Sequence, residues 1–327
     1  MSSASSLPYK LRPNKAVDRE IFLSMLNRLS GILGIENYRY VGLGGPFLED
    51  FRLLHARIGI KEMVCIEADE NTHKRQMFNR PFKSIDCIHS SIEDYVNGTE
   101  FETPTIVWLD FTDPREIQAQ IELFSNLLLE LPALSILRIT LNANPSSLGK
   151  PDPDELKIQR KNGVVSSEVE LRWRLERFKE RFSTYCPADL GFENMTHLNY
   201  GKAVLEALRL SAEKNILDSH EKNIVWSFST HYSDGQPMVT ATVMVTKNEN
   251  TEIERAFDGW EFRSSPSNPL ILDLPALSAL ERLTLEKGEA SEESLGFKLP
   301  KSLLQENAFE SFRKFYRVFP QFARIDY

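Results

Sequence analysis

Apolar runs alternate with amphipathic segments through the first half of the chain, and this alternation predicts strands separated by helices. The runs that we predict as strands are residues 38–43, 63–67, 84–89, 105–110 and 134–141. They are almost continuously apolar, which is typical of strands covered by helices on both faces. Strands and helices in this order predict a parallel sheet with right-handed crossovers.

Apolar residues at helical spacing predict a first helix that follows Pro13 and ends near Gly34. Further helices are expected at 47–58, 70–78 and 92–96. The most clearly delimited helix begins at Asp113, which can cap it, and stops at Pro132. Helices therefore follow the first four predicted strands.

The pattern changes after residue 145, and no clear strand is found before residue 223. A charged helix opens at Ser167, and further helices are expected at 202–217, 274–285 and 303–319. Two strands, 223–230 and 238–245, flank a short polar turn, so they must be antiparallel. We expect an N-terminal arm at 1–13, a main domain at 14–250 with a helical insertion at about 146–222, and a helical appendage at 251–327.

Composition and charge narrow the classes of protein. The formal net charge of −8 disfavours extensive binding to nucleic acid. Three cysteines, Cys65, Cys87 and Cys186, are too few and too scattered for a disulfide framework or a zinc site. No apolar run is long enough to span a membrane, and the first residues lack the apolar stretch of a signal peptide, so we expect a cytoplasmic protein.

A glycine-rich turn follows the first predicted strand in the segment YVGLGGPF. Gly42, Gly44 and Gly45 let the backbone approach a ligand closely, although an ordinary tight turn has the same composition. A dinucleotide-binding loop is the rival interpretation, but Phe47 stands where its third glycine belongs. The next helix also opens with acidic residues, which repel a pyrophosphate.

Glu67 ends the second predicted strand, about twenty residues after these glycines. A carboxylate there can accept hydrogen bonds from both hydroxyls of a ribose. Asp69 can do the same or cap the following helix. Five βα units, a final hairpin and these motifs together resemble the class I methyltransferases that use S-adenosylmethionine, and the resemblance covers about residues 14–245.

This resemblance implies a Rossmann-like α/β fold: a mostly parallel sheet of seven strands with an antiparallel final strand. It also implies that the glycine turn holds the methionine half of S-adenosylmethionine, and that Ser91 and Ile92 contact its adenine. Ser91 is equally suited to cap a short helix. The whole chain is similar to bacterial proteins described as O-methyltransferases.

The family places its catalytic or substrate-orienting residue at the end of the fourth strand, which is Asp110 here. The segment after Asp110 departs from the Asn-Pro-Pro-Tyr motif of amino-group methyltransferases, so an oxygen acceptor is preferred. Asn142 and Asn144 leave the fifth strand beside the expected cleft and are weak candidates for substrate contacts. A second carboxylate for Mg²⁺ is missing, so no metal is predicted.

Two charged segments lie outside these motifs. The basic segment before the first helix can offer a cation or Asn14 to the cofactor carboxylate, or it can be a solvated arm. The arginine series 172, 174, 177 and 181 is interleaved with glutamates and predicts an exposed helix face with ion pairs four residues apart.

The sequence thus predicts a methyltransferase that uses S-adenosylmethionine and modifies an oxygen atom of an unidentified acceptor. A methyltransferase-like binding module without catalysis is one alternative. An NAD(P)-dependent oxidoreductase is another alternative, but this sequence lacks the Tyr-Lys or His constellation that such an enzyme needs for catalysis.

Overall fold

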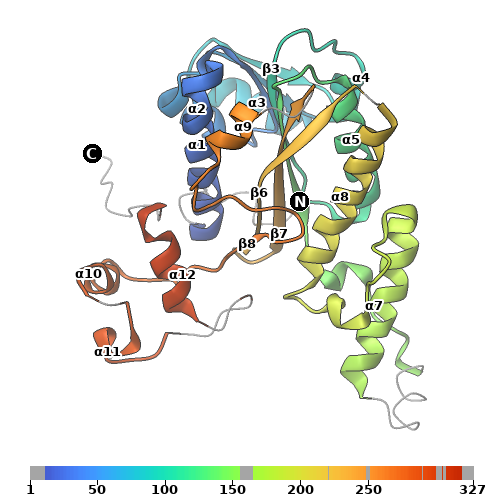
Figure 1. The fold of residues 1–327 in the computed structure, drawn as a ribbon, viewed down its shortest axis with the longest axis vertical. Coiled ribbons are helices and arrows are strands. Elements are labelled where there is room, and N and C mark those ends of the chain that lie inside the picture. Colours follow the sequence, from blue (N-terminus) through green and yellow to red (C-terminus); the bar gives the residue numbers. More distant parts are fainter. Residues whose placement is uncertain are drawn as a thin grey trace.

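The computed structural model describes residues 12–154, 165–219, 221–247, 251–288, 290–299, 304 and 307–318. Its strands form one sheet with the order β3-β2-β1-β4-β5-β7-β6-β8 (Figure 1). The strands are β1 Arg39–Gly42, β2 Glu62–Glu67, β3 Ile85–His89, β4 Thr105–Asp110, β5 Ile136–Asn142, β6 Asn223–Ser233, β7 Pro237–Thr246 and β8 Leu270–Leu272.

Strands β1 to β5 are mutually parallel, as predicted. Strand β7 is antiparallel to both β5 and β6, so the predicted hairpin is confirmed. The expected count of seven strands was wrong, because β8 adds a short eighth strand parallel to β6. The antiparallel strand is therefore β7 and not the last strand of the sheet. The segment predicted to be mostly helical supplies β8, which is too short to give a clear sequence pattern.

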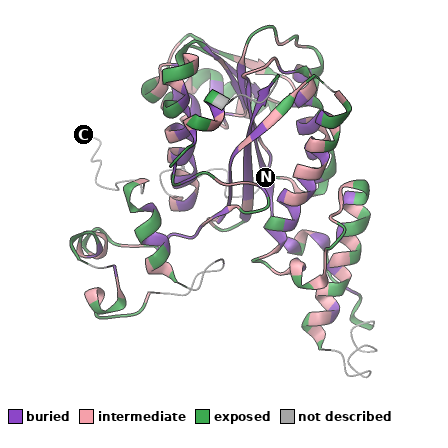
Figure 2. Ribbon diagram, viewed as in Figure 1, coloured by how far each residue is buried: buried purple, intermediate pink, exposed green. Residues whose placement is uncertain are grey.

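Helices cover both faces of the sheet (Figure 1). One face carries α1, α2 and α9, and the other carries α5 and α8, each side with its own large buried apolar cluster. The helices are α1 Pro13–Leu33, α2 Glu49–Ile58, α3 Glu70–Asn79, α4 Ile92–Asn97, α5 Ile117–Glu130, α7 Ser166–Phe182, α8 Tyr200–Ser219, α9 Thr251–Ala256, α10 Ala279–Lys287, α11 Glu292–Leu295 and α12 Ala308–Phe315. Figure 2 shows the sheet buried between the helices and the outer helix faces exposed.

Single helical turns join several of these elements. They are η3 Ile35–Asn37, η4 Pro114–Glu116, η5 Pro145–Leu148, η6 Ser183–Tyr185, η7 Phe192–Met195 and η8 Tyr316–Val318. The predicted insertion contains no strand in its described residues, as expected. None of the helices that the structure describes combines the length and apolar character needed to cross a bilayer.

The C-terminal segment differs from the prediction in detail. Helix α10 starts at Ala279 and not at residue 274, because Ser278 and Glu281 form a capping box there. The expected ends of the last helix, residues 303 and 319, lie outside the described residues, as do residues 1–11 of the expected arm. Phe257, Trp260 and Leu272 lie in the buried cluster that also holds α1 and α2, so this part of the appendage belongs to the main core.

A buried ion pair fastens α1 to the centre of the sheet. Asp18 of α1 pairs with Arg138 of β5, and both side chains are fully buried. Asp18 also accepts hydrogen bonds from the hydroxyls of Thr230 (2.8 Å) and Thr240 (3.2 Å). The Arg138 guanidinium lies 4.5 Å from the ring centre of Trp108. The buried charge is therefore both paired and hydrogen-bonded, as a folded protein requires.

Candidate functional site

The predicted site residues lie in the segments that follow β1 to β5. Because these strands are parallel, the segments gather at the carboxyl edge of the sheet, where ligands bind in open α/β folds. The helical insertion with α7 and the C-terminal helices α10 to α12 lie at the same end of the molecule, on opposite sides (Figure 1). The carboxyl ends of β1 to β5 therefore lie along the edge of the sheet where the site is predicted.

The structural reason for a glycine differs among the three predicted positions. A Cβ atom on Gly42 would lie 2.6 Å from the Tyr40 hydroxyl, and one on Gly44 would lie 2.6 Å from Leu48 Cδ2. These two glycines are therefore needed for the packing of the protein itself. Gly45 has a φ of +51°, and a Cβ atom added to it would meet no atom within 4 Å, so it is required by backbone conformation and faces open space. Among the three, Gly45 best suits close approach by a ligand.

Glu67 lies at the end of β2 with both carboxylate oxygens held in place. Oε1 accepts a hydrogen bond from the Asp69 amide (2.9 Å), and Oε2 accepts one from Gln76 Nε2 (3.4 Å). Burial raises the pKa of Glu67 above its usual value. A carboxylate has about four acceptor positions, so Glu67 retains acceptor capacity for a ligand.

Gln76 of α3 is a site residue that sequence reasoning missed. Its fully buried amide donates to the carbonyl oxygen of Gly45 (3.1 Å) as well as to Glu67. Asn79, one turn later, donates to the carbonyl oxygen of Pro46 (2.7 Å). These amides join the glycine turn to the end of β2. The available signal was two amide side chains three residues apart on one helix, which is weak without knowledge of what the helix faces.

The short polar residues after β2 and β3 cap helices. Asp69 accepts hydrogen bonds from the amide and hydroxyl of Thr72, and these bonds lower the pKa of Asp69. Ser91 accepts a hydrogen bond from the Asp94 amide (3.0 Å) at the start of α4. Ile92 is buried in the cluster on that side of the sheet. The capping interpretation is thus observed for Asp69 and Ser91, while their contacts with a cofactor stay predictions.

Asp110, the predicted catalytic residue, ends β4 and is paired with two cations of α1. Its Oδ2 lies 3.4 Å from Lys15 Nζ and 3.8 Å from Arg19 Nη2. Burial acts to raise the pKa of Asp110, but the charges of Lys15 and Arg19 outweigh burial, so the pKa lies below its usual value. Its Oδ1 is buried and accepts no hydrogen bond that meets normal geometry within the described residues. Asp110 is therefore an ionised carboxylate and a weak proton acceptor.

The described part of the N-terminal basic segment, from residue 12 onwards, is tied to the rest of the protein. Asn14 donates to Ser233 and Asp234 in the turn between β6 and β7 and accepts from the Leu274 amide (2.8 Å). These contacts use both ends of its amide, so Asn14 does not suit the predicted contact with a cofactor carboxylate. Lys15 is nearly buried beside Asp110, so it is not part of a solvated arm.

The two asparagines after β5 also make structural contacts. Asn142 donates to the Thr112 carbonyl (3.2 Å) and accepts from the Asn144 amide (2.9 Å). Asn144 caps η5 through the Ser146 amide and donates to Gln236. Their role towards a substrate stays a prediction. Among the described residues, no group of three or more His, Cys, Asp or Glu side chains is arranged to hold a metal ion.

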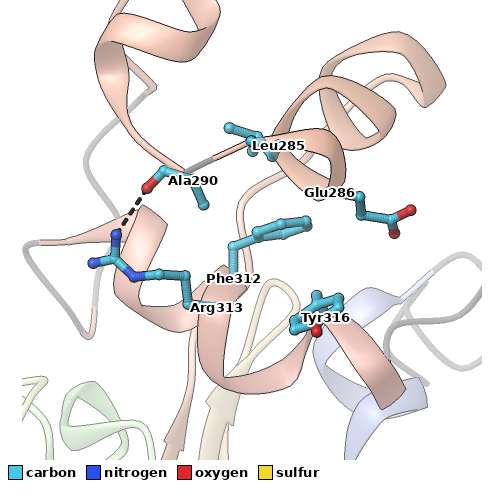
Figure 3. A pocket seen from close by; sticks show the side chains of 7 residues that line it. Leu285, Glu286, Ala290, Phe312, Arg313 and Tyr316 are labelled. Atoms are coloured by element: carbon cyan, nitrogen blue, oxygen red, sulfur yellow. Dashed lines mark hydrogen bonds between the residues drawn. The ribbon is translucent and has the colours of Figure 1, made fainter.

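A pocket lies away from these predicted residues, between α10 and α12 (Figure 3). Leu285, Phe312 and Tyr316 provide much of its lining, and Arg313 donates to the carbonyl oxygen of Ala290 (2.9 Å). None of the site residues predicted from the sequence lines it.

Comparisons with known proteins identify the family to which the chain belongs. Residues 7–327 match the family described as "Putative O-methyltransferase". A search of curated proteins gave no match. One similar solved structure is Trm1 from Pyrococcus horikoshii with S-adenosyl-L-methionine: 14% identity, TM-score 0.40, 74% of this chain and 57% of Trm1 covered. This chain therefore matches little more than half the length of Trm1.

Two further solved structures are similar to this chain. The plantazolicin methyltransferase BamL, in complex with a desmethyl analogue and SAH, has 15% identity, a TM-score of 0.39, and coverage of 75% of this chain and 91% of BamL. An rRNA methylase from Streptococcus thermophilus has 10% identity, a TM-score of 0.33, and coverage of 68% and 95%. Because the family match spans nearly the whole sequence, this chain belongs to the methyltransferase family described as "Putative O-methyltransferase".

Proposed function

We propose that this protein binds S-adenosylmethionine at the carboxyl ends of β1 to β3 and transfers its methyl group to an oxygen atom of an acceptor. The link that Gln76 makes between Gly45 and Glu67 carries this proposal. It holds an open backbone turn and a ribose-binding carboxylate next to each other. A small molecule with a ribose and an amino-acid tail needs this pair of features.

The charges around the glycine turn favour S-adenosylmethionine over a dinucleotide. Asp50, at the start of α2, is buried and pairs with Arg19 through two hydrogen bonds of 2.6 Å and 3.0 Å. Glu49 lies beside it in the first turn of the helix. A pyrophosphate needs the amides of such a helix end without carboxylates in front of them. S-adenosylmethionine carries no phosphate, and its ammonium and sulfonium cations outweigh its single carboxylate, so acidic residues at this helix end do not repel it overall.

When bound, S-adenosylmethionine supplies an electrophilic methyl group. Asp110 would then orient the acceptor hydroxyl by accepting its hydrogen bond at Oδ1, while Lys15 and Arg19 keep the carboxylate ionised. Orientation of the reacting groups is the main contribution that an enzyme makes to such a displacement. The same ion pairs make Asp110 a poor general base, and this observation also keeps a binding module without catalysis as the second candidate.

Binding experiments test the cofactor. S-adenosylhomocysteine should bind in isothermal titration calorimetry and raise the melting temperature, because a ligand of the native state stabilises it. NAD and NADP should do neither. Binding of a dinucleotide without any response to S-adenosylhomocysteine would contradict the proposal, and cofactor binding without methyl transfer to any hydroxyl acceptor would favour the binding module.

A further inference from the structure

Arg181, in the last turn of α7, differs from the other arginines on its helix. The others pair with glutamates: Arg172 with Glu168, Arg174 with Glu170 and Arg177 with Glu180. Arg181 forms no ion pair within the described residues. It donates to the carbonyl oxygens of Pro114 (3.2 Å) and Ser147 (3.3 Å) and lies 3.5 Å from the Ser147 hydroxyl. The predicted exposed face with ion pairs four residues apart is confirmed only for Arg172, because Arg174 is buried and Arg177 pairs with a glutamate three residues away. It is wrong for Arg181.

The hydroxyl of Tyr200 lies close to this unpaired charge. Tyr200 is fully buried, and its hydroxyl lies near enough to the Ser147 and Arg181 side chains to interact with both, although neither contact meets normal hydrogen-bond geometry. Burial raises the pKa of Tyr200 to about 12, although the Arg181 charge and the Ser147 hydroxyl oppose the rise. The hydroxyl is therefore protonated at neutral pH and is available as a donor beside Arg181.

Trp173 adds another donor on the same side of α7. Its Nε1 is buried without a hydrogen-bond partner and lies 4.0 Å from the position of a Cβ atom on Gly149. Gly149 follows Ser147 by two residues, and the Arg177 guanidinium covers the Trp173 ring at 4.9 Å. The segment after β5 is thus faced by N–H and O–H donors that lack acceptors.

The position of these donors connects them to the proposed reaction. Ser147 follows β5, and Pro114 follows β4 four residues after Asp110. Both segments leave the carboxyl edge of the sheet, where ligands of open α/β folds bind. Arg181 joins the two segments on the side of β4 and β5, whereas Gly45 and Glu67 lie on the side of β1 and β2.

We infer that Arg181, Ser147 and Tyr200 bind an anionic group, a carboxylate or a phosphate, of the methyl acceptor. The inference rests on the proposed function. An oxyanion can accept from a guanidinium and two hydroxyls together, and such charge-assisted hydrogen bonds are the strong ones. If Arg181 served only to join the two loops, the carbonyl contacts would account for it, but the buried Trp173 Nε1 on the same side of α7 would still lack an acceptor.

NMR of the full chain with 15N-labelled tryptophan tests the inference. The chain has four tryptophans, and Trp173→Phe identifies the Trp173 indole signal. We expect inorganic phosphate or succinate to shift this signal saturably, beyond the effect of sodium chloride at equal ionic strength. Arg181→Met should weaken the binding at least about tenfold, since it removes the charge that recognises the anion. Arg181→Lys, which keeps the charge, should retain part of the wild-type affinity. Arg172→Met is the control, because Arg172 is a paired and exposed arginine of the same helix, and this variant should bind the anion like the wild type.

A saturable shift with phosphate or with succinate, weakened by Arg181→Met and unchanged by Arg172→Met, supports the inference. The anion that binds more tightly shows whether the site prefers a phosphate or a carboxylate. Equal binding by Arg181→Met and the wild type would overturn it, as would a wild-type response no larger than that to sodium chloride. If Arg181→Met loses its native melting transition, Arg181→Lys decides the question. An affinity of Arg181→Lys equal to that of the wild type would overturn the inference that the guanidinium recognises the anion. Calorimetry with S-adenosylhomocysteine on the same samples separates the two proposals: binding of this ligand without an anion response overturns only the anion site.

Discussion

Glu67 and Asp110 end two strands of the same sheet, but their surroundings give them different acid–base properties. Burial raises the pKa of Glu67, whereas the charges of Lys15 and Arg19 hold the pKa of Asp110 below its usual value despite burial. Glu67 is also fixed by hydrogen bonds to both oxygens, while Asp110 uses Oδ2 for its cations. At the scale of single residues, these partners suit Glu67 to hold a ribose and Asp110 to orient a hydroxyl.

Replacing Glu67 with glutamine should weaken S-adenosylhomocysteine binding at least about tenfold, because hydrogen bonds to a charged acceptor are worth about 1.5–3 kcal/mol each before losses. Calorimetry measures the change. Glu62→Gln is the matched control, since Glu62 lies at the opposite end of β2 and pairs with Arg39 on the surface. Equal dissociation constants for Glu67→Gln and the wild type would mean that Glu67 does not hold the ribose.

The affinity for S-adenosylhomocysteine should also depend on pH through Glu67. The raised pKa of Glu67 means that it takes up a proton at a higher pH than an ordinary glutamate, for which the pKa is about 4.3. Protonation removes the charged acceptor, so affinity should be full at neutral pH and fall as the pH falls through the raised pKa. Calorimetry from about pH 7 to about pH 5 measures this, and Glu67→Gln should show a flatter profile. Parallel profiles would assign the dependence to another group.

Asp110→Asn should leave S-adenosylhomocysteine binding nearly normal and slow methyl transfer by about a hundredfold or more, because the acceptor hydroxyl loses the carboxylate that orients it. The rate is measured with a hydroxyl acceptor found by screening the wild-type protein. Asp113→Asn is the control, because Asp113 lies in the same loop but caps η4 and pairs with exposed Arg115. A wild-type rate for Asp110→Asn would show that the Asp110 carboxylate does not orient the acceptor.

At the scale of helices and strands, capping side chains decide where helices begin, and small residues decide how closely a helix and a strand pack. Helices α3, α4 and α10 each start after a side chain that accepts a backbone hydrogen bond: Asp69, Ser91 and Ser278. Such caps stabilise a helix by about 1 kcal/mol and are readable from the sequence. The contact of α8 with β6 depends instead on Gly201, since a Cβ atom there would lie 2.7 Å from His231 Cε1.

Gly201→Ala should therefore lower the free energy of unfolding by about 1–3 kcal/mol, the usual cost of overfilling a packed core. His231 is fully buried, so its ring has little freedom to move aside. Gly31→Ala is the control, because Gly31 is an exposed residue of α1 and an added Cβ atom would meet nothing within 4 Å. This variant should raise the free energy of unfolding by about 0.5–1 kcal/mol. Urea unfolding measures both, and equal effects at the two positions would contradict the packing argument.

At the scale of the whole molecule, buried polar contacts join parts of the chain that are distant in sequence. Asp18 and Arg138 join α1 to the middle of the sheet, and Asn14 joins α1 to the turn after β6 and to the segment after β8. Lys15 and Arg19 extend the same helix to Asp110 at the candidate site. The position of α1 is therefore coupled to the charge state of the proposed catalytic residue.

Arg138→Met should destabilise the protein by about 3–5 kcal/mol, because it leaves the buried Asp18 carboxylate without its cation. The double variant Asp18→Asn with Arg138→Met should recover a substantial part of the loss, since no buried charge then stays unpaired. Thermal and urea unfolding measure both. A double variant as unstable as the sum of its single variants would show that the ion pair itself contributes little.

The strands, the helices of the first half and the antiparallel hairpin could be predicted from the sequence because apolar periodicity and caps act over a few residues. The glycine turn, Glu67 and Asp110 could be singled out for the same reason, since each ends a recognisable strand. The tertiary structure alone revealed β8, whose three residues gain their place by pairing with β6.

The partners of the site residues were likewise decided by tertiary contacts. Lys15 and Asp110 are separated by 95 positions, and Asp18 and Arg138 by 120. Sequence periodicity carries no information over such separations, because only the folded chain brings these charges together and buries them. The identity of the candidate carboxylates is therefore a local property of the sequence, whereas their pKa values, and the acceptor-free donors around Arg181, are properties of the fold.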